Sequence, residues 1–457
     1  MIPSITFPAV ELAKITAAQL YEQRLLFLLL LLRSPQLRLV YVTALPVDPA
    51  IVDYYLRFLP ETADARSRLS MVTLDDPSNR ALSEKLLDRS DVLDRVRALA
   101  GDPDDACVLT FNVTVAEQAV SSRLGLALYG PSPELVPLGS KSGSRQVARR
   151  ARVAVLEGAE DLHSVAALDE AVARLRERRP SAGAVVVKLN NGFSGQGSVM
   201  VTLPPGDAGL SLPSAPSIFC AAEESWPSFS AKLAAEGAIV EELVREPGVV
   251  SPSVQLHASP AGTFEVVSTH DQILGGPGNQ VYIGCSFPAH PDYRLAIQEA
   301  ATRIGAVLAA EGVVGSFGID FLVVPYGRPP VGRDVYLSEI NLRMGGTTHP
   351  FWMVRLATGG RYDVASGELT AGGRAKSYVA TDNIKSASLV GRTPASVIEA
   401  VEGAGMGFDP ASATGVTLHL LGAVPGFGKV GLTCIADNPE AAEALSQQAT
   451  EVLVGPG

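Results

Sequence analysis

The segment Glu339-Ile340-Asn341-Leu342-Arg343 most narrows what this chain can fold into. Polar and apolar residues alternate along it, which is typical of a strand with one face against a core. Glu339, Asn341 and Arg343 therefore share the other face. In apolar company, such groups are costly to bury without a cation and an anion to pair with them. The alternation predicts a strand that carries a charged site.

A neighbouring strand supplies a second carboxylate. Residues 315–321 and 335–341 are predicted to pair antiparallel through the turn-rich stretch 325–330, which places Asp320 opposite Glu339. Two carboxylates and an amide oxygen are the hard ligands that Mg²⁺ prefers when phosphates also hold it. Asp320, Glu339 and Asn341 are thus candidate metal ligands. The alternative is the solvated polar face of an amphipathic strand.

A glycine-rich loop joins two further predicted strands, residues 184–190 and 198–203, and Lys188 stands in the first of them. Glycines let backbone N–H groups close around phosphate oxygens, and the lysine adds a positive charge beside them. No helix is predicted after the loop, which argues against a Walker A motif or a dinucleotide fingerprint. A plain turn is the alternative. The candidate nucleotide contacts in the loop are Gly192, Ser194, Gly195, Gln196 and Gly197.

Two more elements frame this loop. Upstream, Lys141 lies in the Gly/Ser-rich stretch 139–145, which opens a predicted helix. Downstream, an apolar strand over residues 237–244 ends in acids and could present backbone groups to an adenine ring. Its candidate contacts are Glu241, Glu242, Leu243 and Val244. The serial order is therefore a lysine, a lysine with a glycine loop, an acidic strand end, and then the Asp and Glu-x-Asn-x-Arg strands.

Length and composition indicate a globular protein of several modules. The chain has 457 residues, 47% apolar and 19% charged, which excludes general disorder. Strands and helices alternate up to residue 130, which predicts a Rossmann-like domain with a parallel sheet. Residues 131–245 and 246–374 are expected to form two α+β parts. A C-terminal α+β segment, 375–457, is expected to hold helices near 394–402 and 439–453 and a hairpin across 425–428.

The charge balance limits the class of partner. The net charge of -11 opposes binding to a nucleic-acid backbone, because counterion release requires clustered lysines and arginines. The one basic cluster, residues 145–152, is either a solvated helix face or a phosphate contact. We expect no nucleic-acid partner.

Cysteine spacing and one apolar run bear on the compartment. Four cysteines lie far apart without a CxxC pair, which fits free thiols in a reducing compartment better than disulfides or zinc. The apolar run at residues 25–32 is far shorter than the roughly 20 residues that cross a bilayer. Acidic Glu11 and Glu22 precede it, unlike in a signal peptide. We expect a cytoplasmic protein with no membrane partner.

Over about residues 131–372 the order of these elements resembles the ATP-grasp superfamily. The resemblance implies an α/β and α+β fold in which two subdomains clasp ATP with two magnesium ions, for which Mn²⁺ could substitute. It implies that Lys141 and Lys188 bind phosphate, that residues 192–197 form a lid and that 241–244 form the adenine hinge. Asp320, Glu339 and Asn341 would be the metal ligands, and Arg343 would face the transferred phosphate or acyl group. The long separation of Asp320 from Glu339 suggests a hairpin insertion, and Glu246 is the candidate ribose contact.

Segments outside this core look like the pheganomycin-type peptide ligases, a bacterial branch of the superfamily: residues 42–47, 54–56, 129–131, 139–145 and 416–436. This narrower resemblance implies an ATP-dependent carboxylate–amine ligase that forms an amide through an acyl phosphate and releases ADP and phosphate. Such a reaction belongs to peptide natural-product and antibiotic biosynthesis. The alternatives are an ATP-grasp phosphotransferase or biotin-type carboxylase, and a non-catalytic ATP-binding scaffold or sensor.

The resemblance leaves the substrates open beyond their class, a small carboxylate donor and an amino-acid or peptide amine acceptor. His349, in the glycine-rich stretch after Arg343, is the one histidine we consider for catalysis, alongside Arg343 and Lys188. His270, His349 and His419 are scattered singly along the chain, and each is more typical of a structural or surface histidine than of a ligand. Residues 271–286 could border the acceptor pocket or form a loop over the core. A homodimer is compatible with the sequence but not indicated by it.

Overall fold

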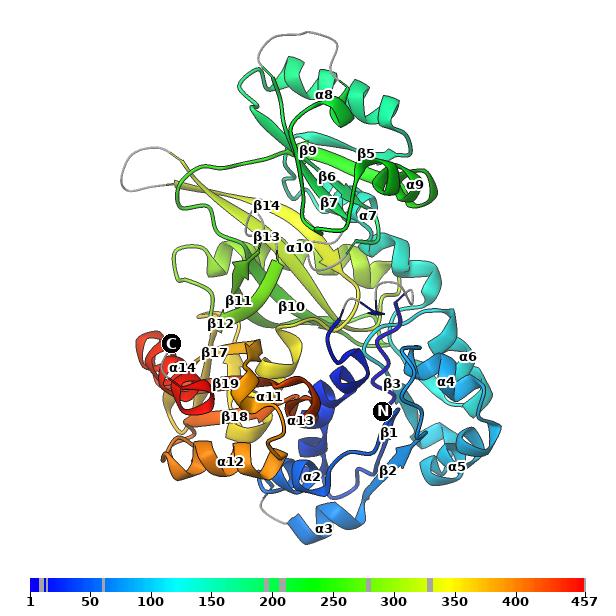
Figure 1. The fold of residues 1–457 in the computed structure, drawn as a ribbon, viewed down its shortest axis with the longest axis vertical. Coiled ribbons are helices and arrows are strands. Elements are labelled where there is room, and N and C mark those ends of the chain that lie inside the picture. Colours follow the sequence, from blue (N-terminus) through cyan, green and yellow to red (C-terminus); the bar gives the residue numbers. More distant parts are fainter. Residues whose placement is uncertain are drawn as a thin grey trace.

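The computed structural model describes residues 1–7, 12–13, 15–59, 62–192, 197–204, 211–276, 281–326 and 332–455. Figure 1 shows an elongated molecule with a small five-stranded sheet at one end, a long sheet through the middle, and the two chain ends in the broad opposite half. The mixed α/β and α+β class predicted from the sequence is confirmed.

The first 130 residues alternate helices and short parallel strands. The strands pair as two separate parallel couples, β1 (Leu39–Thr43) with β2 (Leu69–Thr73) and β3 (Cys107–Leu109) with β4 (Ala127–Tyr129). The intervening helices are α2 (Pro49–Leu56), α3 (Thr62–Ser67), α4 (Leu82–Leu87), α5 (Ser90–Ala100), the 3-10 turn η2 (Pro103–Asp105) and α6 (Val115–Leu124). The parallel pattern was predicted; its division into two couples was not.

The apolar run at residues 25–32, within this module, lies in a 3-10 helix, η1 (Ala18–Arg33). Its leucines lie in the core that the N-terminal and C-terminal parts of the chain share. Among the described residues, no helix has both the length and the hydropathy that a membrane crossing needs.

The small sheet has the strand order β5-β9-β6-β7-β8, all antiparallel. Its strands are β5 (Gly158–Leu162), β6 (Ala184–Leu189), β7 (Ser198–Thr202), β8 (Ser217–Phe219) and β9 (Ala238–Glu242), accompanied by η3 (Pro133–Gly139), α7 (Lys141–Arg150), α8 (Val165–Arg178), η4 (Leu212–Ser214) and α9 (Trp226–Glu236). β5 and α8 were not predicted. The antiparallel β6–β7 pair confirms the predicted strands on either side of the glycine loop.

The long sheet joins the two remaining parts of the chain. Its order is β14-β13-β10-β11-β12-β17-β16-β15, and β19 pairs with both β17 and β18. The first strands are β10 (Pro252–Ala258), β11 (Phe264–Gly275), β12 (Val281–Phe287), β13 (Gly315–Tyr326) and β14 (Gly332–Asn341), with helix α10 (Arg294–Ala310) packed over them. Residues 271–286, which the sequence left as either a loop or a pocket border, contribute to two strands, the end of β11 and most of β12.

The C-terminal part continues the same sheet. It contains α11 (Thr348–Thr358), β15 (Arg361–Asp363), β16 (Glu368–Ala371), β17 (Arg374–Lys385), η6 (Ala387–Leu389), α12 (Pro394–Gly403), β18 (Gly415–His419), η7 (Leu421–Ala423), α13 (Val424–Phe427), β19 (Lys429–Ala436) and α14 (Pro439–Val454). Both helices predicted after residue 375 are present. The predicted hairpin is also present as β18–β19, but η7 and α13 connect its strands in place of a tight turn.

Candidate active site

The acidic strand lies at the edge of the long sheet, next to the small one. β13 and β14 pair antiparallel with Asp320 directly opposite Glu339, and a register shift follows at Phe321. This pairing confirms the geometry predicted from the alternation. β14 is also bonded to the small-sheet part, because Ile340 N–H donates to the hydroxyl of Ser144 in α7 at 2.9 Å. The pairing and this bond fix where the acids face.

The three candidate metal ligands form one cluster. The amide Nδ2 of Asn341 donates to Glu339 Oε1 at 2.7 Å and to Asp320 Oδ2 at 3.1 Å. Gln272 of β11 donates to the other oxygen of Asp320 at 2.8 Å. Burial and the neighbouring Glu339 carboxylate raise the pKa of Asp320 above its usual range. The cluster therefore holds more negative charge than its own amide donors can balance.

This donor set fits a divalent cation. A cation between Asp320 and Glu339 would offset their burial and their mutual repulsion, the two causes that raise the Asp320 pKa. A half-turn of the Asn341 amide, in exchange for its hydrogen bond from Arg343, would aim its oxygen at the same point and give the all-oxygen environment that Mg²⁺ prefers. The structure thus brings together all three residues that the sequence nominated, and their assignment as ligands stays a prediction.

Lys141, the first residue of α7, reaches across to the cluster. Its ammonium forms an ion pair with Glu339 and donates to Gly192 O at 3.3 Å. Although burial alone would raise the pKa of Glu339, the Lys141 charge, the Asn341 amide and Lys188 hold it below its usual range. Helix α7 starts here because the Ser140 side chain caps it by accepting from Gly143 N at 3.0 Å.

Lys188 belongs to a second, more deeply buried ion cluster. Its ammonium donates to Glu241 Oε1 at 2.6 Å, and Arg145 donates to the other oxygen of Glu241 at 3.2 Å. Burial lowers the pKa of Lys188, but the Glu241 carboxylate raises it by more, so the net shift is upward. Arg145 is only 2% exposed, whereas Arg149 and Arg150 are about half exposed. Within the basic stretch 145–152, Arg145 is thus buried and holds Glu241, whereas Arg149 and Arg150 face solvent.

Sequence reasoning missed Arg145 as a partner of the hinge. No sequence signal marked it, because Arg145 is one of several arginines in the basic stretch 145–152 and its partner Glu241 is 96 residues away. In the hinge, Glu242 receives a hydrogen bond from Glu157 N at 3.3 Å, and Leu243 N donates to Ala184 O at 3.0 Å. Leu243 and Val244 follow β9 in the chain. An adenine contact would thus come from the backbone here, because the Glu241 carboxylate is already held.

The glycine loop is partly described. Gly192 and Gly197 flank its base, where Leu189 N donates to Gly197 O at 2.8 Å. Gly197 has a φ of 73°, and an added Cβ would press on the Leu189 side chain at 3.2 Å, so glycine is required at this position. Ser194, Gly195 and Gln196 lie outside the described residues, and their phosphate contacts stay a prediction.

Arg343 follows the cluster on the same side of the chain. Its guanidinium donates to Asn341 Oδ1 and to Met344 O, each at 3.0 Å, and lies 5.8 Å from the ring centres of Phe7 and Phe111. Both hydrogen bonds go to neutral oxygens. The positive charge thus stands beside the acids while remaining available to an incoming anion.

His349 contacts a different set of residues. Its Nε2 lies 3.0 Å from Asp382 Oδ1 and 3.1 Å from His419 Nε2, and Arg24 donates to the other oxygen of Asp382 at 3.0 Å. The expectation that His349 and His419 are scattered singly is therefore wrong. His270 is a separate buried residue, 2.6 Å from the Tyr378 hydroxyl.

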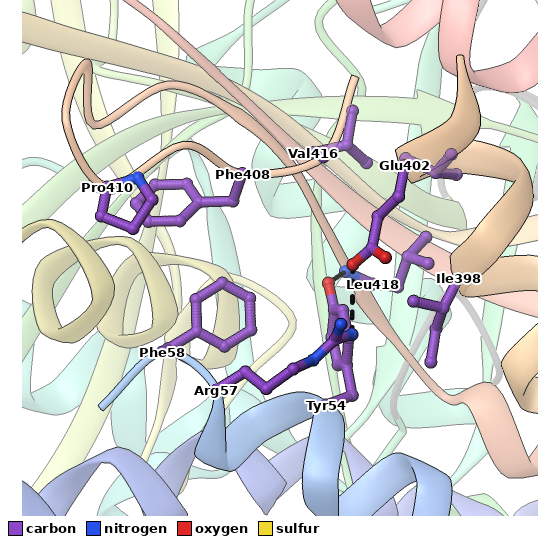
Figure 2. A pocket seen from close by; sticks show the side chains of 11 residues that line it. Tyr54, Arg57, Phe58, Ile398, Glu402, Phe408, Pro410, Val416 and Leu418 are labelled. Atoms are coloured by element: carbon purple, nitrogen blue, oxygen red, sulfur yellow. Dashed lines mark hydrogen bonds and ion pairs between the residues drawn. The ribbon is translucent and has the colours of Figure 1, made fainter. Parts of the chain in front are cut away.

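A pocket elsewhere in the protein contains none of the predicted catalytic, nucleotide-binding or metal-binding residues. Figure 2 shows it between α2, α12 and β18, lined by rings such as Tyr54, Phe58 and Phe408. Tyr54 Oη accepts from Leu418 N at 2.9 Å, and Arg57 pairs with Glu402 at 3.1 Å. The tyrosine pair of residues 54 and 55 thus has a structural role, since Tyr55 also donates to Leu418 O.

Comparisons with known proteins agree with this architecture. The family described as IQCH-like, ATP-grasp matches residues 215–365, and the PGM1 C-terminal domain matches residues 396–449. L-propargylglycine–L-glutamate ligase of Streptantibioticus cattleyicolor is 34% identical over 435 residues, covering 93% of this chain and 87% of that protein. The similarity therefore spans the acidic cluster and the C-terminal segment together.

Solved structures share the fold at low identity. A biotin carboxylase of Campylobacter jejuni aligns with a TM-score of 0.55 and 15% identity, covering 94% of this chain and 88% of that one. N5-carboxyaminoimidazole ribonucleotide synthetase of Thermus thermophilus aligns with a TM-score of 0.52 and 16% identity, covering 95% and 98%. These likenesses concern the fold.

Proposed function

The chain belongs to the pheganomycin-type peptide ligases of the ATP-grasp superfamily, and on that premise we propose that it joins the carboxylate of one amino acid to the amine of another. It is a ligase that forms C–N bonds at the expense of ATP. The observation that carries the proposal is the acidic cluster Asp320–Glu339–Asn341, which lies within reach of Lys141 and beside Arg343. The amino-acid class follows from the name of the relative, which joins L-propargylglycine and L-glutamate.

Magnesium would be held by Asp320, Glu339 and Asn341, and it would supply charge neutralisation at phosphate oxygens. We propose two ions, replaceable by Mn²⁺, because two carboxylates and an amide provide enough oxygens to share between them. The present ion pairs balance the cluster through Lys141 and the hinge through Lys188. With ATP bound, both lysines would turn toward its phosphates.

The reaction would proceed in two steps. A donor carboxylate oxygen attacks the γ-phosphorus, the bond to the β-phosphate oxygen breaks, and an acyl phosphate and ADP result. The amine nitrogen then attacks the acyl carbon, loses a proton and expels phosphate. Arg343 would stabilise the charge on the transferred group in both steps, because its guanidinium is positioned by hydrogen bonds to two neutral oxygens, Met344 O and Asn341 Oδ1. The hydrogen bonds of His349 go to Asp382 and His419, so we give it no step.

The ATP dependence and the cysteines bear on the cellular compartment. We propose a cytoplasmic enzyme of peptide natural-product or antibiotic biosynthesis, supported by its ATP dependence and by four free cysteines. A homodimer is compatible with this role.

The test is product identification. Purified protein is incubated with ATP, Mg²⁺ and pairs of amino acids, beginning with L-glutamate as one partner, and the products are read by mass spectrometry. We expect a product whose mass is the sum of both amino acids less one water, together with stoichiometric ADP. A phosphorylated amino acid as the stable product would indicate a phosphotransferase, and ADP release that depends on bicarbonate would indicate a carboxylase. Either result would overturn the proposal.

A further inference from the structure

A second cluster of ligand-type side chains lies apart from the acidic strand. His349 begins α11, Asp382 is in β17, and His419 ends β18. All three are buried, and their three nearest donor atoms lie within 4.8 Å of one another. None of these residues is needed for the proposed ligase reaction, so the cluster requires its own explanation.

The three atoms converge on one point. His419 Nε2 lies 2.6 Å from Asp382 Oδ1, His349 Nε2 lies 3.0 Å from the same oxygen, and the two Nε2 atoms are 3.1 Å apart. Ligands bonded to one zinc ion at roughly 2.0–2.1 Å with tetrahedral angles lie roughly 3.3 Å from one another. The three observed separations are shorter, that of the His419–Asp382 pair most, so the side chains would move apart slightly to admit the ion.

Hydrogen bonds satisfy this triangle in one arrangement, in which both rings donate to Asp382 Oδ1. Each Nε2 carries at most one hydrogen, and two donors on one oxygen would hold the two nitrogens 3.1 Å apart. If only one ring carries the hydrogen, the lone pair of the other nitrogen faces the lone pairs of the carboxylate oxygen. A cation held by the three atoms is the alternative, because each atom then offers it a lone pair.

The surroundings support ligation by these atoms. Arg24 donates to Asp382 Oδ2 at 3.0 Å, which leaves Oδ1 for the convergent point and fixes the carboxylate. A metal would require neutral imidazoles and an ionised carboxylate here, and its binding would release any protons that these groups carry.

The fold prepares the position of His419. On β19, Gly431 lies directly opposite His419, and any added Cβ there would collide with the imidazole ring. The backbone just before His419 is held by two tyrosines. Leu418 N–H donates to the hydroxyl of Tyr54, and the hydroxyl of Tyr55 donates to Leu418 O. Leu420, which follows His419, has a φ of 56°. This backbone conformation is unfavourable for a leucine and has to be maintained by its surroundings.

We propose that His349, Asp382 and His419 bind a transition-metal ion, zinc by ligand type, separate from the magnesium site. Two imidazoles and one carboxylate are ligands that zinc accepts, and Mg²⁺ prefers an all-oxygen set. The ion would join α11, β17 and β18, and thus fasten the C-terminal segment to the core. Three protein ligands leave one position for water or another small ligand.

Metal analysis of the purified protein tests this. After dialysis against buffer with Mg²⁺ and no chelator, elemental analysis should find one zinc ion per chain in the wild type and a loss of most of it in His419→Gln. The matched control is His270→Gln, which removes another fully buried histidine of the same sheet and should keep its zinc. Circular dichroism and ATP binding establish that each variant is folded.

Cobalt provides a second readout that needs no variant. Co²⁺ added to chelator-treated wild-type protein should produce visible absorption of a His/carboxylate site, and excess Zn²⁺ but not excess Mg²⁺ should abolish it. Wild-type protein that holds no transition metal and takes up neither Zn²⁺ nor Co²⁺ would overturn the proposal. Equal zinc in wild type and His419→Gln would overturn it as well, since the ion would then lie elsewhere.

Discussion

The acidic cluster on β13 and β14 and the histidine cluster around Asp382 use similar chemistry in opposite settings. The acids sit on one hairpin, beside a loop and two lysines that can turn away from them. The two histidines and Asp382 come from three separate elements, and they are surrounded by Gly431, Arg24 and the backbone of Leu418, which Tyr54 holds. The first arrangement suits ions that arrive and leave with a nucleotide; the second suits an ion that stays.

This contrast also predicts which property of the protein is lost when either cluster is disrupted. Loss of an exchangeable site should reduce turnover and leave stability nearly unchanged. Loss of a resident site should reduce stability and metal content first. Each of the following predictions separates these two outcomes.

The largest effect is expected for Glu339→Gln. Removing this carboxylate takes away a magnesium ligand and the partner of Lys141, so ADP release with amino-acid substrates should fall by about a hundredfold or more. Zinc content should match the wild type. The control Glu299→Gln changes an exposed acid on α10 and should turn over normally. Wild-type turnover in Glu339→Gln would rule out its role as a ligand.

A smaller effect, on stability, is expected for Gly431→Ala. The new methyl group would collide with the His419 ring, and overpacking of this kind costs about 1–3 kcal/mol in the free energy of unfolding. Urea unfolding measures the loss, and the zinc content should fall with it. Gly426→Ala, in the connection between β18 and β19 and with open space around the added carbon, should be nearly neutral. Unchanged stability and zinc in Gly431→Ala would show that the ring is not held as described.

The smallest effect is expected for Tyr54→Phe. The change leaves the Leu418 N–H without its 2.9 Å partner and should lower the free energy of unfolding by about 1 kcal/mol. Because Leu418 precedes His419, zinc affinity should weaken slightly, which a competition titration with a chelator can measure. Tyr326→Phe, at a 55% exposed tyrosine, should change stability by less than about 0.5 kcal/mol. Equal changes in stability and zinc affinity in both variants would show that the Tyr54 hydrogen bond does not support the histidine cluster.

The acidic cluster was predictable because its information is local. Alternation along residues 339–343 fixed the shared face, and one hairpin brought Asp320 opposite Glu339. The ATP-grasp resemblance, the peptide-ligase branch and the ligase activity were likewise confirmed. The individual roles of Lys141, Lys188, the loop residues and the hinge stay predictions.

The histidine cluster and the buried arginines were not predictable, because they depend on tertiary packing. His349 and His419 are 70 residues apart, and Asp382 lies 37 residues before His419. No spacing rule links such positions. The Arg145–Glu241 pair spans 96 residues in the same way. Strand β12 was also missed as a strand, since its partners β11 and β17 flank it only in the folded sheet.

The pairing of β12 with β17 has a practical consequence for anyone who shortens this protein. Residues 281–287 bond on one side to β17, through Cys285, Ser286 and Phe287 opposite Ala380, Val379 and Tyr378. A fragment that stops before β17 would expose this apolar strand as an open edge and uncover Cys285 and Phe287, which are otherwise fully enclosed. Expression of the nucleotide-clasping part alone should therefore yield aggregates, and fusion partners are better placed at the ends of the full chain.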